Sequence, residues 1–153
     1  MSHINENIDY TVSAYIICNN KVLLRNHEKY SIWLPPNGHL EPNEDILDAL
    51  HREVLEEVGL AITILGDPAH TYDDGSTDLP LPLSINKHSI NEAHQHIDFA
   101  YAARSVSEDI HPGEGEMSDP ERFKWFTDEE LHNSPDVKQR VKAHALQALR
   151  LAQ

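Results

Sequence analysis

Hydrophobic residues gather in two short runs near the start of the chain, separated by two asparagines. The first run, TVSAYIIC, covers residues 11–18, and the second, KVLLR, covers residues 21–25. β-Branched and aromatic residues are typical of strands, and the pair Asn19-Asn20 suits a type I′ turn. These residues predict a β-hairpin. A short extended segment at residues 32–38, interrupted by two prolines, follows it.

Apolar residues in the next segment recur at the spacing of an α-helix. Four of them lie three or four positions apart and form one stripe: Leu47, Leu50, Val54 and Val58. Asp45 is a suitable N-cap, with the acidic Asp48 in the first turn. Gly59 suits the left-handed position that closes a helix. We therefore predict a helix between Asp45 and Gly59 whose apolar stripe packs against the core.

The following stretch alternates between short apolar runs and polar segments that contain glycine and proline. Strands are predicted at residues 61–65, 96–103 and 122–126. Loops are predicted at residues 71–82 and 106–120.

A second helix closes the chain. Ser134 with Pro135 makes an N-cap and first-turn pair, and the helix is predicted to run to near Leu151. One of its faces is apolar: Val137, Val141, Ala145, Ala148 and Ala152. The order strand, strand, helix, three strands and helix predicts an α/β (α+β) sandwich with a mixed β-sheet. We expect residues 1–153 to form a single domain.

Composition and charge limit the classes of function. The 153 residues are 39% hydrophobic and 25% charged, which suits one globular domain with a core. The chain contains no run of about 18 apolar residues, so no transmembrane helix is predicted, and the first residues lack a signal-peptide pattern. The single Cys18 excludes an internal disulfide, so a cytoplasmic location is expected. The net charge of −14 disfavours duplex nucleic acid, whereas divalent cations allow a phosphorylated small molecule to bind.

Residues 38–60, GHLEPNEDILDALHREVLEEVGL, carry a fixed pattern of glycine, acidic and basic positions. Gly38 is followed after five residues by Glu44, and seven residues later by the pair Arg52-Glu53. The rest reads aliphatic, any, Glu-Glu, any, Gly, aliphatic. This pattern resembles the complete signature of the Nudix hydrolase family. The resemblance implies an α/β/α sandwich with a mixed sheet between helices, and metal-dependent hydrolysis of a diphosphate that is linked to another group. It also makes a homodimer a reasonable expectation.

Three glutamates of the signature share one face of the predicted helix. Glu53, Glu56 and Glu57 lie at i, i+3 and i+4, within about 100° of one another. Carboxylates this close repel one another unless a cation lies among them, and oxygen ligands favour Mg²⁺, with Mn²⁺ as the second choice. Because the apolar stripe points elsewhere, these carboxylates need not be buried. The resemblance adds a main-chain carbonyl near Gly38 as a further ligand.

Two other charged residues of the signature have a supporting role by resemblance. In the family, the residues at Glu44 and Arg52 pair with each other and brace the loop against the helix. Arg52 is also spaced to reach Glu56 as an i, i+4 pair. The general base stays open: it is Glu56, Glu57 or an acid on a later loop. The loop candidates are Glu114, Glu116 and Glu121.

The chain departs from the common family pattern just before the helix, where Pro35, Asn37 and Asn43 replace a leucine and two glycines. Asn tolerates left-handed backbone angles, so these changes affect the substrate pocket more than the metal face. Aromatic residues that are candidates to stack on a base are Tyr72, Phe99, Tyr101, Phe123 and Trp125. Packing in the core is the competing interpretation.

A histidine-rich strand follows the signature. His94, His96 and Asp98 share one face of an extended strand. This spacing is compatible with a transition-metal site, with substrate contact, or with ordinary strand packing. The sequence supplies no clear fourth ligand.

The leading functional hypothesis is a Mg²⁺-dependent pyrophosphohydrolase of a nucleoside diphosphate derivative. A nucleoside triphosphate, including an oxidised one, is slightly favoured. ADP-ribose or another sugar nucleotide, and a dinucleoside polyphosphate, stay open. The alternative of another class is a non-catalytic nucleotide-binding module. Such a module would be expected to lose the helix carboxylates, which this chain keeps. A general metal-buffering protein does not explain the fixed Gly and Arg positions.

Overall fold

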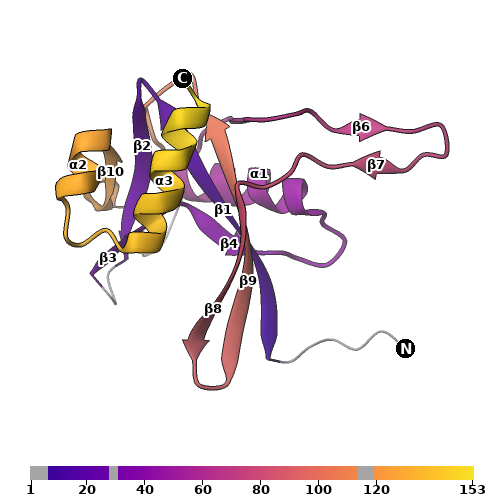
Figure 1. The fold of residues 1–153 in the computed structure, drawn as a ribbon, viewed down its shortest axis with the longest axis horizontal. Coiled ribbons are helices and arrows are strands. Elements are labelled where there is room, and N and C mark those ends of the chain that lie inside the picture. The colour runs from indigo at the N-terminus through magenta and orange to yellow at the C-terminus, as the bar shows by residue number, and fades with distance from the viewer. Residues whose placement is uncertain (1–6, 28–30, 114–118) are drawn as a thin grey trace.

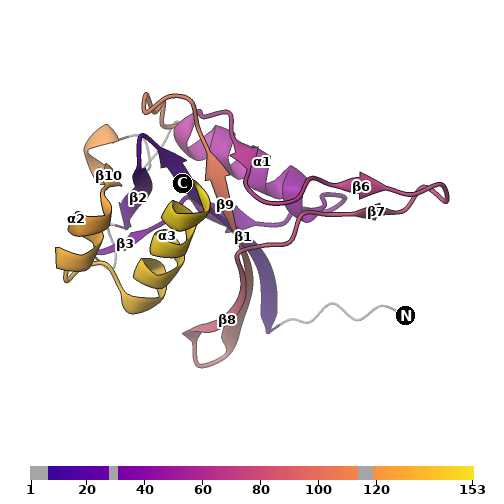
Figure 2. The ribbon, with the colours of Figure 1, turned by 45° about the horizontal axis from the view of Figure 1, so that its top comes forward.

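The structure is a computed structural model that describes residues 7–27, 31–113 and 119–153. A mixed β-sheet lies between two helical layers (Figures 1 and 2). The strands are β1 (Ile8–Cys18), β2 (Lys21–His27), β3 (Ile32–Leu34), β4 (Asn37–His39), β5 (Thr63–Ile64), β6 (His70–Thr71), β7 (Thr77–Asp78), β8 (Ser84–Asn91), β9 (His94–Arg104) and β10 (Phe123–Phe126). The helices are α1 (Ile46–Val58), the 3₁₀ turn η1 (Pro120–Arg122), α2 (Asp128–Asn133) and α3 (Gln139–Leu151).

The central strands β1 and β9 run parallel and organise the sheet. The path of the large sheet is β10-β2-β1-β9-β5, with β3, β4 and β8 paired to β2, β1 and β9 respectively. The hairpin of β1 and β2 is confirmed, and Asn19 and Asn20 both have the positive φ that a type I′ turn requires. The predicted mixed sheet is therefore present.

Alternate residues of β1 supply the two layers of the core. Tyr15 and Ile17 pack towards α3, whereas Ala14 and Ile16 pack towards α1. This alternation follows from the two-residue period of a strand. Both faces of the sheet bury apolar side chains, which explains why TVSAYIIC is apolar almost without interruption.

Helix α1 has the ends that the sequence predicts. The Asp45 side chain accepts from the backbone N–H of Asp48, and the Asp48 carboxylate accepts from the N–H of Asp45 in return. Gly59 closes the helix in the left-handed conformation, with φ of 64°. The predicted apolar stripe packs against the α1 side of the core, which fixes the rotation of the helix.

Several elements differ from the prediction. Strand β8 was missed because SINKHSIN is polar and half-exposed, so no apolar alternation marks it. Residues 71–82, predicted as a loop, contribute to a small hairpin of β6 and β7 that projects from the body (Figure 1). The predicted strand at residues 61–65 is only two residues long.

The start of the last helix was also predicted wrongly. A short helix, α2, precedes it and is capped by Thr127 in a capping box with Glu130. Ser134 ends α2 by donating its hydroxyl to the Glu130 carbonyl, instead of capping α3. Helix α3 begins at Gln139 and has no side-chain cap. In the part of the chain that the structure describes, none of the helices has the length and apolar character needed to cross a membrane.

Candidate functional site

The three signature glutamates of α1 differ strongly in burial. The Glu56 side chain is 61% exposed, Glu53 is 16% exposed, and Glu57 as a whole residue is 5% exposed. The expectation that this face need not be buried is therefore wrong for Glu57. Glu57 is in the last turn of α1, and its buried carboxylate lies near Arg25 of β2 and the backbone N–H of Asn37 in β4.

Glu57 carries a buried carboxylate with incomplete pairing. Its Oε2 has no hydrogen-bond partner among the described residues. Burial raises the pKa of Glu57 from 4.5 to about 7, although the Arg25 guanidinium and the backbone N–H of Asn37 lower it. An unpaired buried oxygen is costly, so this atom is available to a partner that the described residues do not supply.

Gly38 lies directly against the Glu53 carboxylate. A Cβ at Gly38 would fall 2.0–2.3 Å from the carboxyl carbon and oxygens of Glu53. Strand β4, which contains Gly38, is held against β1 by the pairing of Gly38 with Val12. Only glycine, which has no Cβ, leaves room here for the Glu53 carboxylate; we call this contact the glycine cradle.

Arg52 connects the loop before α1 to the acidic face. Its guanidinium donates to both carboxylate oxygens of Glu44, to Glu53 at 2.8 Å and to Glu56 at 3.3 Å. It also donates to the carbonyl of His39 at 2.9 Å. These bonds hold the pKa of Glu44 below its usual value, aided by the backbone N–H of Glu41. The pairings of Arg52 with Glu44 and with Glu56 are both present.

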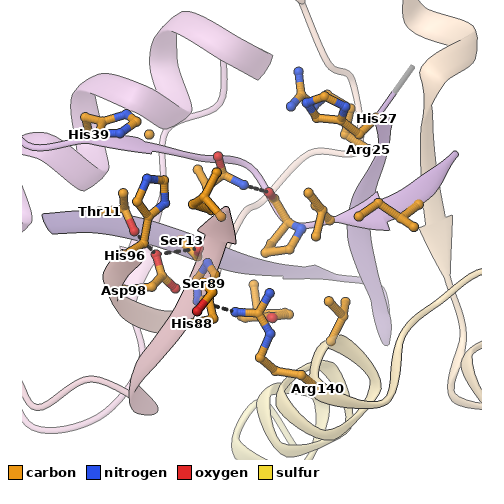
Figure 3. A pocket seen from close by; sticks show the side chains of 18 residues that line it. Thr11, Ser13, Arg25, His27, His39, His88, Ser89, His96, Asp98 and Arg140 are labelled. Carbon is orange, nitrogen blue, oxygen red and sulfur yellow. Dashed lines mark hydrogen bonds between the residues drawn. The ribbon is translucent and has the colours of Figure 1, made fainter. Parts of the chain in front are cut away.

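A pocket of about 450 Å³ opens next to this face (Figure 3). Arg25 and His27 lie at one end, and His39 and His96 lie at the other. Gly38 lines the pocket too, which joins it to the acidic face of α1. The volume is typical of a small-molecule site.

The pocket wall contains one buried acid and one paired arginine. Asp98 is 7% exposed and accepts hydrogen bonds from Thr11 at 2.7 Å and Ser13 at 2.9 Å, both on Oδ1. Arg140 of α3 donates to His88 Nδ1 at 2.9 Å and to Asn86 at 3.1 Å. Sequence reasoning missed Arg140 because the last helix was interpreted only through its apolar stripe.

The histidine-rich strand divides into two parts. Asp98 accepts hydrogen bonds from hydroxyls of β1 and is not grouped with His94 and His96, so the metal site that the spacing allowed does not form with these three residues. Asp9 of β1 takes that place: it lies opposite His96 in the sheet and contacts His94 Nε2 at 3.0 Å. Burial lowers the pKa of His96, and the charges of His39 and His94 lower it further. Sequence spacing carries no signal for Asp9, because the pairing joins residues far apart in the chain.

The candidate stacking aromatics lie away from the pocket. Tyr101 and Phe123 are buried in the core, and Phe99 and Trp125 pack against its α1 side. Tyr72 is on the projecting hairpin and donates to Asp78. None of the five lines the pocket, so the competing interpretation of core packing holds for four of them.

The loop acids have separate outcomes. Glu114 and Glu116 lie outside the described residues. Glu121 is exposed in η1 and lines a different, polar depression together with Asp119 and Arg122. Gly113 packs on the backbone of Glu56, since a Cβ there would meet the Glu56 carbonyl oxygen at 2.4 Å. The loop after β9 therefore packs, through His111 and Gly113, against the backbone at the C-terminal end of α1.

Comparisons with known proteins show the family and the fold of the chain. The family model of the NUDIX domain matches residues 8–149. A crystal structure of a NUDIX-family hydrolase from Clostridium perfringens is 33% identical, with a TM-score of 0.84, and the match covers 95% of this chain and 98% of that one. The crystal structure of the C. elegans Ap4A hydrolase is 18% identical, with a TM-score of 0.63, and has the same fold. That match covers 94% of this chain and 96% of the C. elegans chain.

A curated relative from Lactococcus lactis subsp. cremoris, a probable DHNTP pyrophosphohydrolase, is 32% identical over 98 residues. That match covers 64% of this chain and 55% of the relative, so the chain spans about half of that protein's length. The chain belongs to the Nudix hydrolase family.

Proposed function

We propose that this protein hydrolyses a pyrophosphate bond in a small nucleoside diphosphate-linked substrate, with Mg²⁺ as cofactor and a triphosphate as the favoured substrate. One observation carries the proposal. The buried Glu57 carboxylate, with an oxygen that no described residue pairs, lies on the same helix face as Glu53 and Glu56 beside a ligand-sized pocket.

The residues fit a hard divalent cation. The unpaired Oε2 of Glu57 needs a partner, and the glycine cradle at Gly38 keeps the Glu53 carboxylate in place. Glu53, Glu56, Glu57 and a main-chain carbonyl near Gly38 would hold Mg²⁺, with Mn²⁺ as the alternative. When bound, the ion neutralises phosphate oxygens and lowers the pKa of a bound water.

The chain's own residues supply positioning and proton transfer. Arg52, held by Glu44, fixes the orientation of Glu53 through its hydrogen bond and leaves Glu56 exposed. A carboxylate of this face, Glu56 or Glu57, accepts the proton of the attacking water. The loop acids Glu114 and Glu116, which lie outside the described residues, stay alternatives for that role.

The pocket suits the part of the substrate that carries no phosphate. Apolar residues form part of its lining: Ile32, Leu34, Pro35 and Val141. Asp98 is its one acidic residue among those described, and Oδ2 takes no part in the bonds from Thr11 and Ser13. A carboxylate in such a wall accepts N–H groups of a heterocyclic ring. The name of the Lactococcus relative supports a triphosphate with such a ring.

The deciding experiment is a substrate panel with Mg²⁺, scored by product identity. The panel contains nucleoside triphosphates, their oxidised forms, DHNTP, ADP-ribose and a dinucleoside polyphosphate. Release of pyrophosphate and a monophosphate from a triphosphate supports the proposal. Release of AMP and ribose phosphate would move the assignment to ADP-ribose. The Glu56→Gln variant is assayed beside the wild type, with Glu129→Gln on exposed α2 as the matched control.

A non-catalytic nucleotide-binding module is the competing function of another class. It predicts nucleotide binding without turnover for every compound on the panel. The cytoplasmic location, the homodimer, the lack of duplex nucleic-acid binding and the single domain over residues 1–153 stay predictions of the sequence.

A further inference from the structure

A second group of ligand-type side chains lies at the end of the sheet where β1 begins. We call Asp9, His39, His94 and His96 the histidine cluster. Its members come from β1, β4 and β9, where these strands run side by side. His94 and His39 approach the Asp9 Oδ2 through Nε2 at 3.0 Å and 3.4 Å. The His96 ring lies 5.0 Å from the ring of His39 and 5.2 Å from that of His94, centroid to centroid.

We propose that the histidine cluster binds one divalent transition-metal ion of the Zn²⁺ class, independently of the carboxylate face of α1. Asp9, His94 and His96 each offer a ligand atom, and these atoms all lie within 4.8 Å of one another. Ligand atoms about 2.0–2.2 Å from a tetrahedral ion lie about 3.4 Å apart. Side-chain rotations that move the ligand atoms by about 1 Å would therefore complete the site without moving the strands.

The sheet holds the ligand-bearing backbones in place. Asp9 lies directly opposite His96 in the parallel pairing of β1 and β9. His39 lies on β4, which pairs with β1 on its other side. Figure 3 shows His39 and His96 close together at one end of the pocket. His39 lies outside the group of three whose ligand atoms are within 4.8 Å of one another, but its Nε2 is 3.4 Å from Asp9 Oδ2, so a turn of its side chain would make it the fourth ligand.

The chemistry of the donors separates this site from the carboxylate face. Three imidazoles and one carboxylate favour Zn²⁺, Co²⁺, Ni²⁺ or Cu²⁺, whereas an all-oxygen set favours Mg²⁺. The cluster is also accessible, since the side chains of Asp9 and His39 are 47% and 56% exposed. An ion can therefore enter from solvent without unfolding the strand ends.

The test is calorimetric titration of Zn²⁺ into the full chain in buffer that already contains excess Mg²⁺. One site is expected, and Asp9→Asn and His94→Ala are each expected to weaken it at least tenfold, as loss of a ligand requires. His70→Ala, which removes an exposed histidine from the projecting hairpin, is the matched control and keeps the site. Titration with Co²⁺ provides a second measurement, because four-coordinate Co²⁺ absorbs visible light and the His94→Ala variant is expected to lose that band.

The same titration distinguishes this proposal from the proposed function. Glu57→Gln is expected to leave Zn²⁺ binding at the cluster unchanged. The proposal is overturned if wild type binds no Zn²⁺ in the presence of Mg²⁺. It is also overturned if Asp9→Asn and His94→Ala, shown by circular dichroism to be folded, bind Zn²⁺ as wild type does.

Discussion

Glu57 shows how a single residue can combine a cost to stability with a function. Its carboxylate is almost fully buried, and no described group pairs Oε2. The Arg25 charge offsets only part of this, because burial is the largest cause of the raised pKa. A group kept in this state is typical of functional sites, where stability is lower than the sequence could achieve.

The raised pKa of Glu57 predicts a pH-dependent stability difference in the absence of metal. The pKa of Glu57 rises from 4.5 to about 7 on folding, so between these pH values the folded state binds the carboxyl proton more tightly than the unfolded state. The contribution of Glu57 to the free energy of unfolding therefore falls as pH rises through that window. The free energy of unfolding of Glu57→Gln, minus that of wild type, is therefore expected to rise by about 1–3 kcal/mol between pH 5 and pH 8. Urea denaturation in EDTA at both pH values measures it, and an unchanged difference would contradict the burial argument.

Gly38 gives a second prediction at the residue scale. A Cβ at this position overlaps the Glu53 carboxylate, so Gly38→Ala is expected to displace Glu53 and lower kcat/KM at least tenfold, as disturbed metal ligation does. Gly75→Ala is the control, because no heavy atom lies within 4 Å of its Cβ position, although its positive φ makes that variant slightly strained. Equal activity of Gly38→Ala and wild type would show that Glu53 is not held by this contact.

At the scale of elements, α1 is the best predicted part of the molecule. Its apolar stripe, its capping box and its closing glycine are local patterns that the sequence states directly. The degree of burial of each glutamate was not predictable, because it depends on how α1 meets β4 and β1. Strand β8 and helix α2 were missed for a related reason. The first is polar and the second is short, so neither has a periodic apolar signal.

The guanidinium of Arg52 connects the loop before α1 to the helix through several hydrogen bonds. We therefore predict that a positive charge alone does not hold the loop in place. Arg52→Lys keeps the positive charge but cannot reach both Glu44 oxygens, Glu53 and the His39 carbonyl together. We expect a loss of about 1–3 kcal/mol in the free energy of unfolding, with weaker Mg²⁺ binding. Arg150→Lys, at the exposed end of α3, is the control. A fully stable Arg52→Lys variant would show that the brace depends only on charge.

At the scale of the whole molecule, the sheet brings together residues that no sequence window contains. Asp98 reaches Thr11 and Ser13 only because β1 and β9 pair in parallel, and Arg140 reaches the pocket from the last helix. The same pairing puts Asp9 beside His94. Long-range register is therefore the part of the site that spacing rules could not supply, whereas the fold class and the acidic helix face were predictable.

Asp98 in the pocket wall is expected to affect substrate binding and not the catalytic step. Asp98→Asn keeps the shape of the wall but removes a charged acceptor for ring N–H groups. We expect the KM for the preferred substrate to rise about tenfold, while kcat stays within about twofold, as the loss of one hydrogen bond to a charged group predicts. Steady-state kinetics on wild type and Asp98→Asn measures both. A fall in kcat with unchanged KM would place Asp98 in the chemistry instead of in recognition.

The central claim is that the carboxylate face of α1 holds the Mg²⁺ that drives hydrolysis. The most direct measurement is the Mg²⁺ dependence of kcat for triphosphate hydrolysis in wild type, Glu57→Gln and the control Glu129→Gln. Wild type and the control are expected to show no turnover without a divalent cation and saturation with Mg²⁺. In Glu57→Gln, kcat is expected to fall at least a hundredfold, comparable to removal of a major catalytic group. Full Mg²⁺-dependent activity of a folded Glu57→Gln variant would contradict it.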